Sequence, residues 1–201
     1  FWWDRTFLDP AVQPLIWAKG ADRWLMPFEL LGRYAQLLVM PVHLSFDYSG
    51  NAIGRAASLT SPYLWAGIAV AVLGPVALMY CVLKKHWTAV FLLAGFALTY
   101  GVIANLVSLI GVIFAERVIF TPSVFVVLGV AVLAARLPRK VWVPGLAVLT
   151  LAGGVHAGVY AARWSDRLAF YEWSRRQQPR SMRLHQLVAD ELTRAGDLER
   201  A

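Results

Sequence analysis

Long uninterrupted runs of apolar residues dominate the second half of the chain. They cover residues 63–83, 87–107, 120–137 and 141–162. A helix needs about 20 consecutive apolar residues to cross the hydrocarbon core of a bilayer, and these runs are too continuous for the alternating strands of a membrane barrel. The pattern therefore predicts an all-α, polytopic helical membrane protein with four transmembrane helices.

The first 62 residues are more mixed and predict an external or interfacial segment. Within it, residues 24–44 predict one further helix, because Glu29, Arg33 and Gln36 recur at helical spacing on one polar face. Such a face needs contact with protein or water rather than lipid. The pattern leaves open whether this amphipathic helix spans the bilayer, re-enters it or lies at its surface.

The chain changes character after the fourth run. Residues 163–178 are basic and aromatic and predict a juxtamembrane linker between the membrane region, residues 1–162, and the tail. Residues 179–201 predict a soluble helix with one apolar face, a glycine stop at Gly196 and the beginning of a second helix. Because one helix cannot cover its own apolar face, the tail predicts the truncated start of a helical repeat array.

The net charge of the chain indicates which partner it binds. The 201 residues are 59% hydrophobic and carry a formal net charge of +7. Such a charge is typical of nucleic-acid binding, but here the basic residues lie in short loops and in the tail, where anionic lipid headgroups account for them. We therefore expect the bilayer as a partner and no nucleic acid. Neither metal-ligand spacing nor a nucleotide fingerprint occurs, so we expect no metal-binding set in this chain and no cofactor, while the need for a metal stays open.

Lysine and arginine are distributed unequally between the short loops. The turns at 84–86 and 136–140 are basic, whereas the loops at 45–62 and 108–119 carry one arginine each. Cytoplasmic loops are enriched in these residues. We expect the two turns in the cytoplasm and the two loops and the tail in the periplasm or lumen. The arginines of the tail oppose this orientation, but large domains are translocated despite their charge.

The most prominent polar pair is Glu116-Arg117, at the start of the third run. Charges at the edge of a span need partners or water, and the planar fork of an arginine suits a phosphate or a carboxylate. One interpretation is a clamp for a lipid phosphate or sugar phosphate. The alternative is a structural ion pair, or an arginine that extends to the headgroups.

Two further sites precede the first run. Asp47 could act as a base, a metal ligand or a partner for Arg33 or Arg117, or it could be a turn residue. Arg33 and Glu29 could form a simple pair one helical turn apart, or both could line a cavity at the membrane edge.

Several motifs occur in a distinctive order. They are V-Q-P-L at 12–15, L-L-G-R-Y at 30–34, P-V-H-L-S-F-D-Y-S at 41–49, F-A-E-R-V-I-F-T-P-S at 114–123, and the tail that begins P-R-S-M-R-L-H-Q-L at 179. Together they resemble the membrane region of the TMTC-type proteins and their bacterial relatives. These are O-mannosyltransferase-like membrane proteins of the GT-C glycosyltransferase class, followed by tetratricopeptide repeats.

The resemblance implies the membrane part of a glycosyltransferase. Such an enzyme takes a sugar, mannose in the animal members, from a polyprenyl or dolichyl phosphate and passes it to a protein hydroxyl outside the cytosol. The expected location is the bacterial inner membrane, or the endoplasmic reticulum membrane in a eukaryote. Arg117 would contact the carrier phosphate and Glu116 and Asp47 would organise the same outer face, with Arg33 and Tyr48 as further carrier-binding candidates. The repeats would bind protein partners.

The chain also departs from the family pattern. Gln13 stands where asparagine is usual, and Phe120 stands where tyrosine is usual. The catalytic acid of this class lies in the first external loop, before the region that Phe1 begins, so we expect a larger protein, no catalytic residue in this chain and no transferase activity from it alone. A non-enzymatic membrane anchor that presents the repeats to partners is the alternative. A transporter is disfavoured, because the runs hold few interior charges.

Overall fold

The computed structural model describes residues 13–16, 18–41, 44–48, 53, 58–107 and 109–197, and within them it is helical and contains no strand. This confirms the all-α class. The α-helices of this part of the chain are α1 (Ala21–Val39), α2 (Pro62–Leu83), α3 (Trp87–Ile103), α4 (Phe120–Ala134), α5 (Arg139–Ala162), α6 (Arg167–Gln177) and α7 (Met182–Arg194). Short 3-10 turns, η2 (Pro14–Ile16), η3 (Glu116–Ile119) and η4 (Arg163–Ser165), precede or connect them.

Three helical segments are long and apolar enough to cross a membrane. They are Pro62–Leu83, Glu116–Ala134 and Arg139–Ser165, which contain α2, α4 and α5. Very few of their side chains are buried within the protein, as expected for helices that satisfy their own backbone hydrogen bonds and present apolar side chains to lipid. The first, third and fourth predicted runs therefore form helices that can span a bilayer.

The second predicted run forms a shorter helix than its sequence indicates. Helix α3 ends at Ile103 after 17 residues, whereas the apolar run continues to 107. The chain leaves the helix because Asn105 adopts a left-handed backbone conformation with φ of 55°, which asparagine tolerates better than most residues. Its side-chain Oδ1 accepts a hydrogen bond from the Ile110 backbone N–H at 3.0 Å, which stabilises the turn away from the helix axis.

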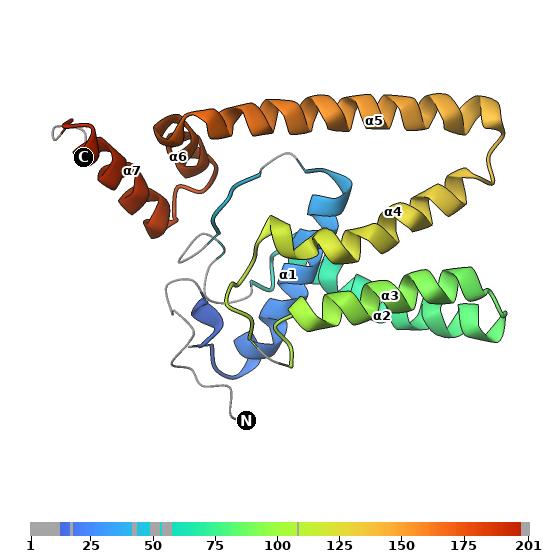
Figure 1. The fold of residues 1–201 in the computed structure, drawn as a ribbon. Coiled ribbons are helices and arrows are strands. Elements are labelled where there is room, and N and C mark those ends of the chain that lie inside the picture. Colours follow the sequence, from blue (N-terminus) through green and yellow to red (C-terminus); the bar gives the residue numbers. More distant parts are fainter. Residues whose placement is uncertain are drawn as a thin grey trace.

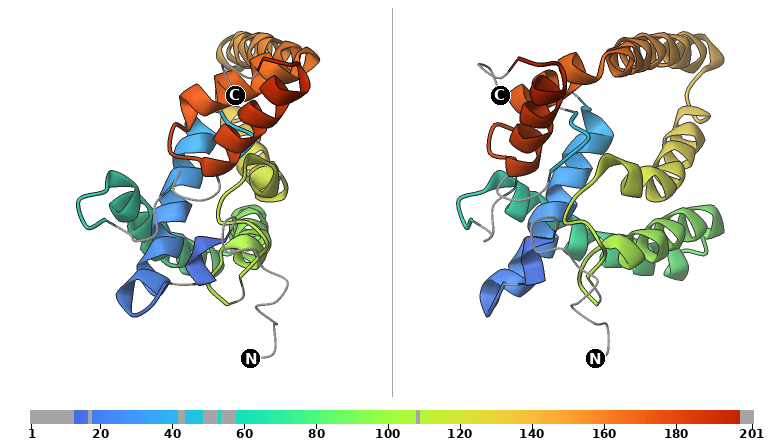
Figure 2. Two further views of the ribbon diagram at one scale, coloured as in Figure 1. Left: turned by 90° about the vertical axis from the view of Figure 1, so that its left-hand side faces the viewer. Right: turned by 60° about the vertical axis from the view of Figure 1, so that its left-hand side comes forward.

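The connections between the helices lie at two opposite ends of the molecule. The α2–α3 turn and the α4–α5 turn are at one end, and the segment between α3 and η3 is at the other, together with α6 and α7 (Figures 1 and 2). We call this second end the outer end. The two basic turns therefore share an end, as the predicted orientation requires, while the compartment that each end faces stays a prediction.

Helix α1 lies crosswise to α2 and α3 rather than alongside them (Figure 1). It meets α2 where Gly32 and Gly67 bring the two backbones into direct contact. A Cβ atom at Gly32 would overlap the Tyr63 carbonyl, and one at Gly67 would overlap the Phe28 carbonyl. Only glycine permits this approach. Helix α1 is thereby fixed on α2, and it is not among the segments apolar enough to span a membrane.

Helices α4 and α5 pack much less extensively. Helix α4 contacts α3, where Gly95 leaves room for the Phe125 ring. Helix α5 has no buried residue along its 24 positions. Its C-terminal end is the exception, because the Tyr160 ring packs against Trp164 and Trp173, with ring centroids 6.4 and 5.5 Å away.

The hydrophobic core is concentrated at the outer end. Tyr34 lies at its centre, stacked on Phe114 at 4.2 Å and edge-on to Tyr100 at 6.0 Å between ring centroids. The other buried members include Leu15, Met26, Leu30, Leu31, Tyr48, Ala104, Ile113 and Ile119. The core therefore joins segments that are widely separated in the sequence.

The buried amide of Gln13 connects the non-helical residues 104–107 and 109–115 to this core. Its Nε2 lies 2.9 Å from Asn105 Oδ1, 2.7 Å from the Ile110 carbonyl and 3.0 Å from the Val112 carbonyl. Gln13 is fully buried. Its hydrogen bonds therefore take the place of water for carbonyl groups that make no helical hydrogen bonds.

The tail is a pair of packed helices. Most of the predicted linker 163–178 is helical, as η4 and α6, and α6 packs against α7. The apolar face of α7 is therefore covered, and its members Leu184, Val188 and Leu192 are buried. The expectation that this helix lacks a partner is wrong, because the aromatic residues of 163–178 form one. Residues 198–201, the predicted start of another helix, lie outside the described residues, and the repeat array stays a prediction.

Candidate functional site

The site residues Glu116 and Arg117 lie where the chain re-enters a helix at the outer end. Ala115 is extended, with φ of −157° and ψ of 139°, and η3 then leads directly into α4. Pro122 is in the first turn of α4, where a missing N–H leaves no helical hydrogen bond unmade. The helix of the third run therefore begins at Phe120, where the run begins, and the charged pair comes immediately before it.

The Glu116 carboxylate is held by the polar segment after α1. Its Oε1 accepts hydrogen bonds from the Ser45 backbone N–H at 2.7 Å and from the Tyr48 hydroxyl at 2.6 Å. The Ser45 N–H also lies 3.0 Å from the Tyr48 oxygen, so the three groups form a closed cluster. Short bonds to an ionised acceptor are the stronger class of hydrogen bond. Glu116 is therefore fixed in position rather than free to swing toward Arg117.

Tyr48 acts as a hydrogen-bond donor in this cluster. Its side chain is buried and packs edge-on against Phe114, with ring centroids 4.8 Å apart. Burial, together with the hydrogen bond to Glu116, raises the pKa of the Tyr48 phenol. The phenol consequently stays protonated around neutral pH and keeps its bond to the carboxylate.

Arg117 has a different environment from its neighbour. Its side chain is exposed, and it makes no hydrogen bond or ion pair with the described residues. The structural ion pair with Glu116, one of the two sequence interpretations, is therefore not formed. The guanidinium is available to a ligand or a lipid headgroup.

An open groove of about 420 Å³ runs between the end of α1 and the start of α4. Its walls are mainly apolar, and its polar contributions come from Glu116, Arg117 and Ser123. The apolar lining consists of Leu37, Leu38, Pro41, Leu44, Ile119 and Phe120. A groove with apolar walls and one unpaired arginine suits an amphipathic anion, in which a hydrocarbon chain carries a charged head.

The structure separates the other predicted site residues from this groove. Asp47 does not pair with Arg33 or Arg117. Its Oδ2 accepts a hydrogen bond from Ser181 at 2.8 Å, and its Oδ1 lies 3.8 Å from an Arg183 nitrogen in the tail.

Arg33 lies at the contact between α1 and α2. It bonds to Glu29 at 2.8 Å and lies over the Tyr63 ring at 4.6 Å, while Glu29 also accepts the Ser58 backbone N–H at 3.3 Å. The simple pair interpretation of Arg33 and Glu29 is therefore the one the structure bears out, and neither residue lines the groove.

Two residues near Glu116, Ser45 and Tyr160, were not predicted from the sequence. Ser45 supplies a backbone N–H to Glu116, which no side-chain pattern can indicate. Tyr160 of α5 lies within electrostatic range of Glu116 and Tyr48, although nothing in the spacing links it to either. The density of aromatic residues at 160–173 was the only available signal.

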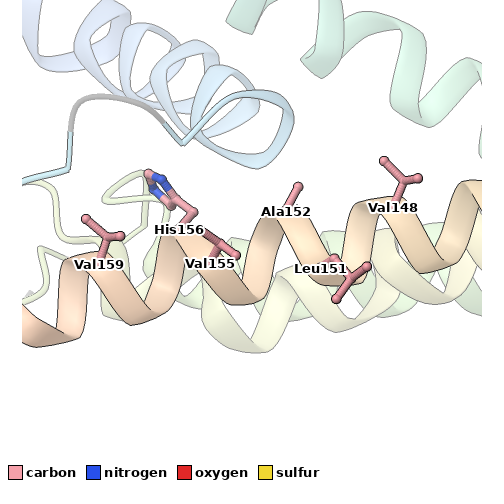
Figure 3. A pocket seen from close by; sticks show the side chains of 6 residues that line it. All are labelled: Val148, Leu151, Ala152, Val155, His156 and Val159. Atoms are coloured by element: carbon pink, nitrogen blue, oxygen red, sulfur yellow. The ribbon is translucent and has the colours of Figure 1, made fainter.

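A second open concavity, of about 630 Å³, lies along α5. Figure 3 shows its lining, in which Ala152, His156 and Val159 extend from the same side of the helix. His156 is its only polar side chain, and a Cβ atom at Gly154 or Gly158 would meet nothing within 4 Å. This face has no charged group, so the groove at Arg117 is the better candidate site.

No group of three or more histidine, cysteine, aspartate and glutamate side chains is arranged to hold a metal ion among the described residues. No protein-family model, no curated protein and no solved structure matches the chain.

Proposed function

We propose that this chain is the C-terminal membrane part of a glycosyltransferase that uses a lipid-linked sugar. The donor is a sugar, mannose in the simplest case, on a polyprenyl or dolichyl phosphate, and the acceptor is a protein hydroxyl outside the cytosol. The observation that supports this proposal is the unpaired Arg117 guanidinium in an apolar groove beside a fixed Glu116 carboxylate. Ser45 and Tyr48 of one family-like motif contact Glu116 of the other at this place.

The chemistry assigned to the groove is binding and charge stabilisation. The isoprenoid chain lies along the apolar wall, and Arg117 holds the phosphate through its planar fork. When the acceptor hydroxyl attacks the anomeric carbon, the phosphate leaves with the bonding electrons, and a nearby cation stabilises the developing charge. We assign the transfer of the hydroxyl proton to none of the groove residues.

Two structural assignments accompany this function. Helix α3 serves as a fourth span despite its 17 residues, because a short helix can be accommodated by local thinning of the bilayer. The pair α6–α7 is the first element of a tetratricopeptide-like array that binds protein partners. The alternative is a membrane anchor without enzymatic activity, and this same helical pair favours it. In that case α3 and α6–α7 have the same roles, but Arg117 does not bind a carrier phosphate.

The test is the affinity for farnesyl phosphate, a short polyprenyl phosphate, in the Arg117→Lys variant in lipid nanodiscs. Lysine keeps the charge but loses the bidentate fork. Losing a charge-assisted hydrogen bond costs about 1.5–3 kcal/mol, so affinity should fall roughly tenfold to a hundredfold. Arg136→Lys, an exposed arginine at the other end of the molecule, is the matched control and should bind normally.

Farnesol, which lacks the phosphate, separates the two parts of the ligand. Its binding should be the same in the parent and in Arg117→Lys, because the substitution leaves the apolar wall intact. Equal affinity of both proteins for farnesyl phosphate would remove Arg117 from the site and leave the anchor as the better function.

The orientation is tested with an impermeant thiol reagent on intact cells. The native Cys81 is first replaced by serine. A single cysteine is then introduced either at Ser58, just before α2 begins, or at Lys85, just after α2 ends. We expect Ser58→Cys to react from outside and Lys85→Cys only after permeabilisation. Reaction of both from outside, or the reverse pattern, would contradict the orientation.

A further inference from the structure

The segment 44–48 contacts two different parts of the molecule through neighbouring residues. Ser45 and Tyr48 bond to Glu116 at the groove. Phe46 and Asp47, between them, contact the tail helices α6 and α7. Because four consecutive residues carry both sets of contacts, the tail and the Glu116 carboxylate are both attached to one short stretch of backbone.

The polar contact to the tail is a buried hydrogen bond between Ser181 and Asp47. The donor and acceptor oxygens are 2.8 Å apart, and Ser181 is 0% and Asp47 7% exposed. The same Ser181 hydroxyl accepts the Leu184 backbone N–H at 3.3 Å and so caps α7. The hydroxyl therefore uses its donor for Asp47 and a lone pair for its own helix.

The apolar contact lies on α6. The Phe46 ring is 5.3 Å from the Phe170 ring and 5.5 Å from the Tyr171 ring, measured between centroids. Both distances are in the range of favourable aromatic pairs. With the Ser181 bond and the Arg183–Asp47 ion pair at 3.8 Å, this contact attaches both helices of the tail to the segment.

The segment itself transmits position from one side to the other. The Ser45 hydroxyl donates to the Asp47 carbonyl at 3.1 Å, which holds these residues in a tight turn. A shift of Asp47 with the tail would therefore move the Ser45 N–H that bonds to Glu116. Buried networks of this kind have discrete arrangements rather than a continuous range of positions.

We propose that the tail pair α6–α7 is a positioning element for the groove, with Ser181 and Phe46 as its attachment residues. Docking of the tail holds 44–48 in the conformation that fixes Glu116. A partner protein that pulls α6–α7 away releases the carboxylate, so binding at the tail is coupled to the groove. This coupling does not depend on the proposed glycosyl transfer.

The test is hydrogen exchange of the parent and of Ser181→Gly in nanodiscs, followed by mass spectrometry without any ligand. Glycine caps a helix almost as well as serine but has no hydroxyl to give Asp47. The Ser45 N–H reports the Glu116 contact directly, so exchange in a peptide covering 44–48 should become about tenfold faster, the change expected for one lost hydrogen bond. Ser165→Gly, the same change at an exposed tail serine, should leave 44–48 unchanged.

A serine that only caps α7 would alter exchange in 183–188 and nowhere else. Unchanged exchange at 44–48 in Ser181→Gly overturns the proposal, whether or not α7 remains protected. Coupling is reciprocal, so Tyr48→Phe, which removes a bond to Glu116, should also accelerate exchange in 183–188. Normal protection of α7 in Tyr48→Phe would likewise overturn it.

Discussion

The outer end and helix α5 place the chain in an apolar environment in different ways. At the outer end, residues 104–107 and 109–115 are not helical, and some of their carbonyl groups accept hydrogen bonds from side chains of distant residues. Arg23 bonds to the carbonyls of Asn105 and Leu106 at 2.8 and 3.3 Å. Helix α5, by contrast, buries no side chain.

The difference follows from where the backbone finds its hydrogen bonds. A helix supplies them internally and needs nothing from its neighbours, whereas irregular backbone away from water requires partners from elsewhere in the chain. The Tyr34 hydroxyl illustrates this, because it lies 3.1 Å from the Ala115 N–H and 3.4 Å from the Ala115 carbonyl. Several polar residues near the membrane edge thus serve the backbone rather than a substrate.

The largest expected effect tests this dependence at Gln13. In Gln13→Glu, a carboxylate oxygen replaces the amide nitrogen that faces three acceptor oxygens. A buried charge without partners costs about 3–5 kcal/mol, so the free energy of unfolding should fall by about that amount at neutral pH. The measurement is reversible unfolding in mixed micelles.

The pH dependence gives this prediction a second readout. Burial beside acceptor oxygens raises the pKa of the introduced carboxyl in the folded state, so the penalty grows as pH rises above about 4.3, the unfolded value for glutamate, and is absent below it. Gln36→Glu makes the same change at an exposed position of α1 and should be nearly neutral. Equal losses in the two variants would mean that the amide of Gln13 does not hold these non-helical residues.

The next largest effect concerns the crossing of α1 and α2. Gly67→Ala places a methyl group on the Phe28 carbonyl, where backbone rather than a flexible side chain must move. Overpacking of this kind costs about 1–3 kcal/mol. Gly74→Ala, on the same helix with open space around it, should be tolerated, because lipid covers that surface. If both variants unfold alike, the outer end is not held more tightly than the lipid-facing helices.

The smallest effect concerns the Arg33 guanidinium over Tyr63. Arg33→Lys keeps the pair with Glu29 but loses the flat contact with the ring, and such contacts contribute about 0.5–1 kcal/mol at partly exposed sites. A double-mutant cycle with Tyr63→Leu isolates this contribution. A coupling energy near zero would show that the ring and the guanidinium are merely adjacent.

The sequence predicted the helices of the membrane region better than their ends. The run at 63–83 became Pro62–Leu83, and the run at 141–162 became Arg139–Ala162. Helix α3 ends at Ile103, before the apolar run ends at 107, because the hydrogen bond between the Asn105 side chain and the Ile110 N–H turns the chain away from the helix axis. The helix at 163–178 was missed, because its apolar residues are aromatic and pack against Phe46 and the end of α5 rather than in a long apolar run.

The candidate site was predicted in part. Glu116, Arg117 and Tyr48 do lie together at the outer end, but Ser181, which bonds to the Asp47 carboxylate, lies 134 residues further along the chain. No periodicity in a sequence encodes such a distance. The interpretation of Asp47 as a partner of Arg33 or Arg117 was therefore wrong, and its attachment to the tail could be found only in the folded chain.

The sequence by itself determined that this protein is helical, and that apolar runs form helices long enough to cross a membrane. The reason is that a helix in lipid satisfies its backbone locally, so length and hydrophobicity are sufficient information. Only the tertiary structure decided which polar side chains bond to the backbone at the outer end and which residues attach the tail. It also decided that Arg117 is left unpaired. Those choices depend on hydrogen bonds between residues far apart in the chain, and such bonds form only when the whole fold brings their donors and acceptors together.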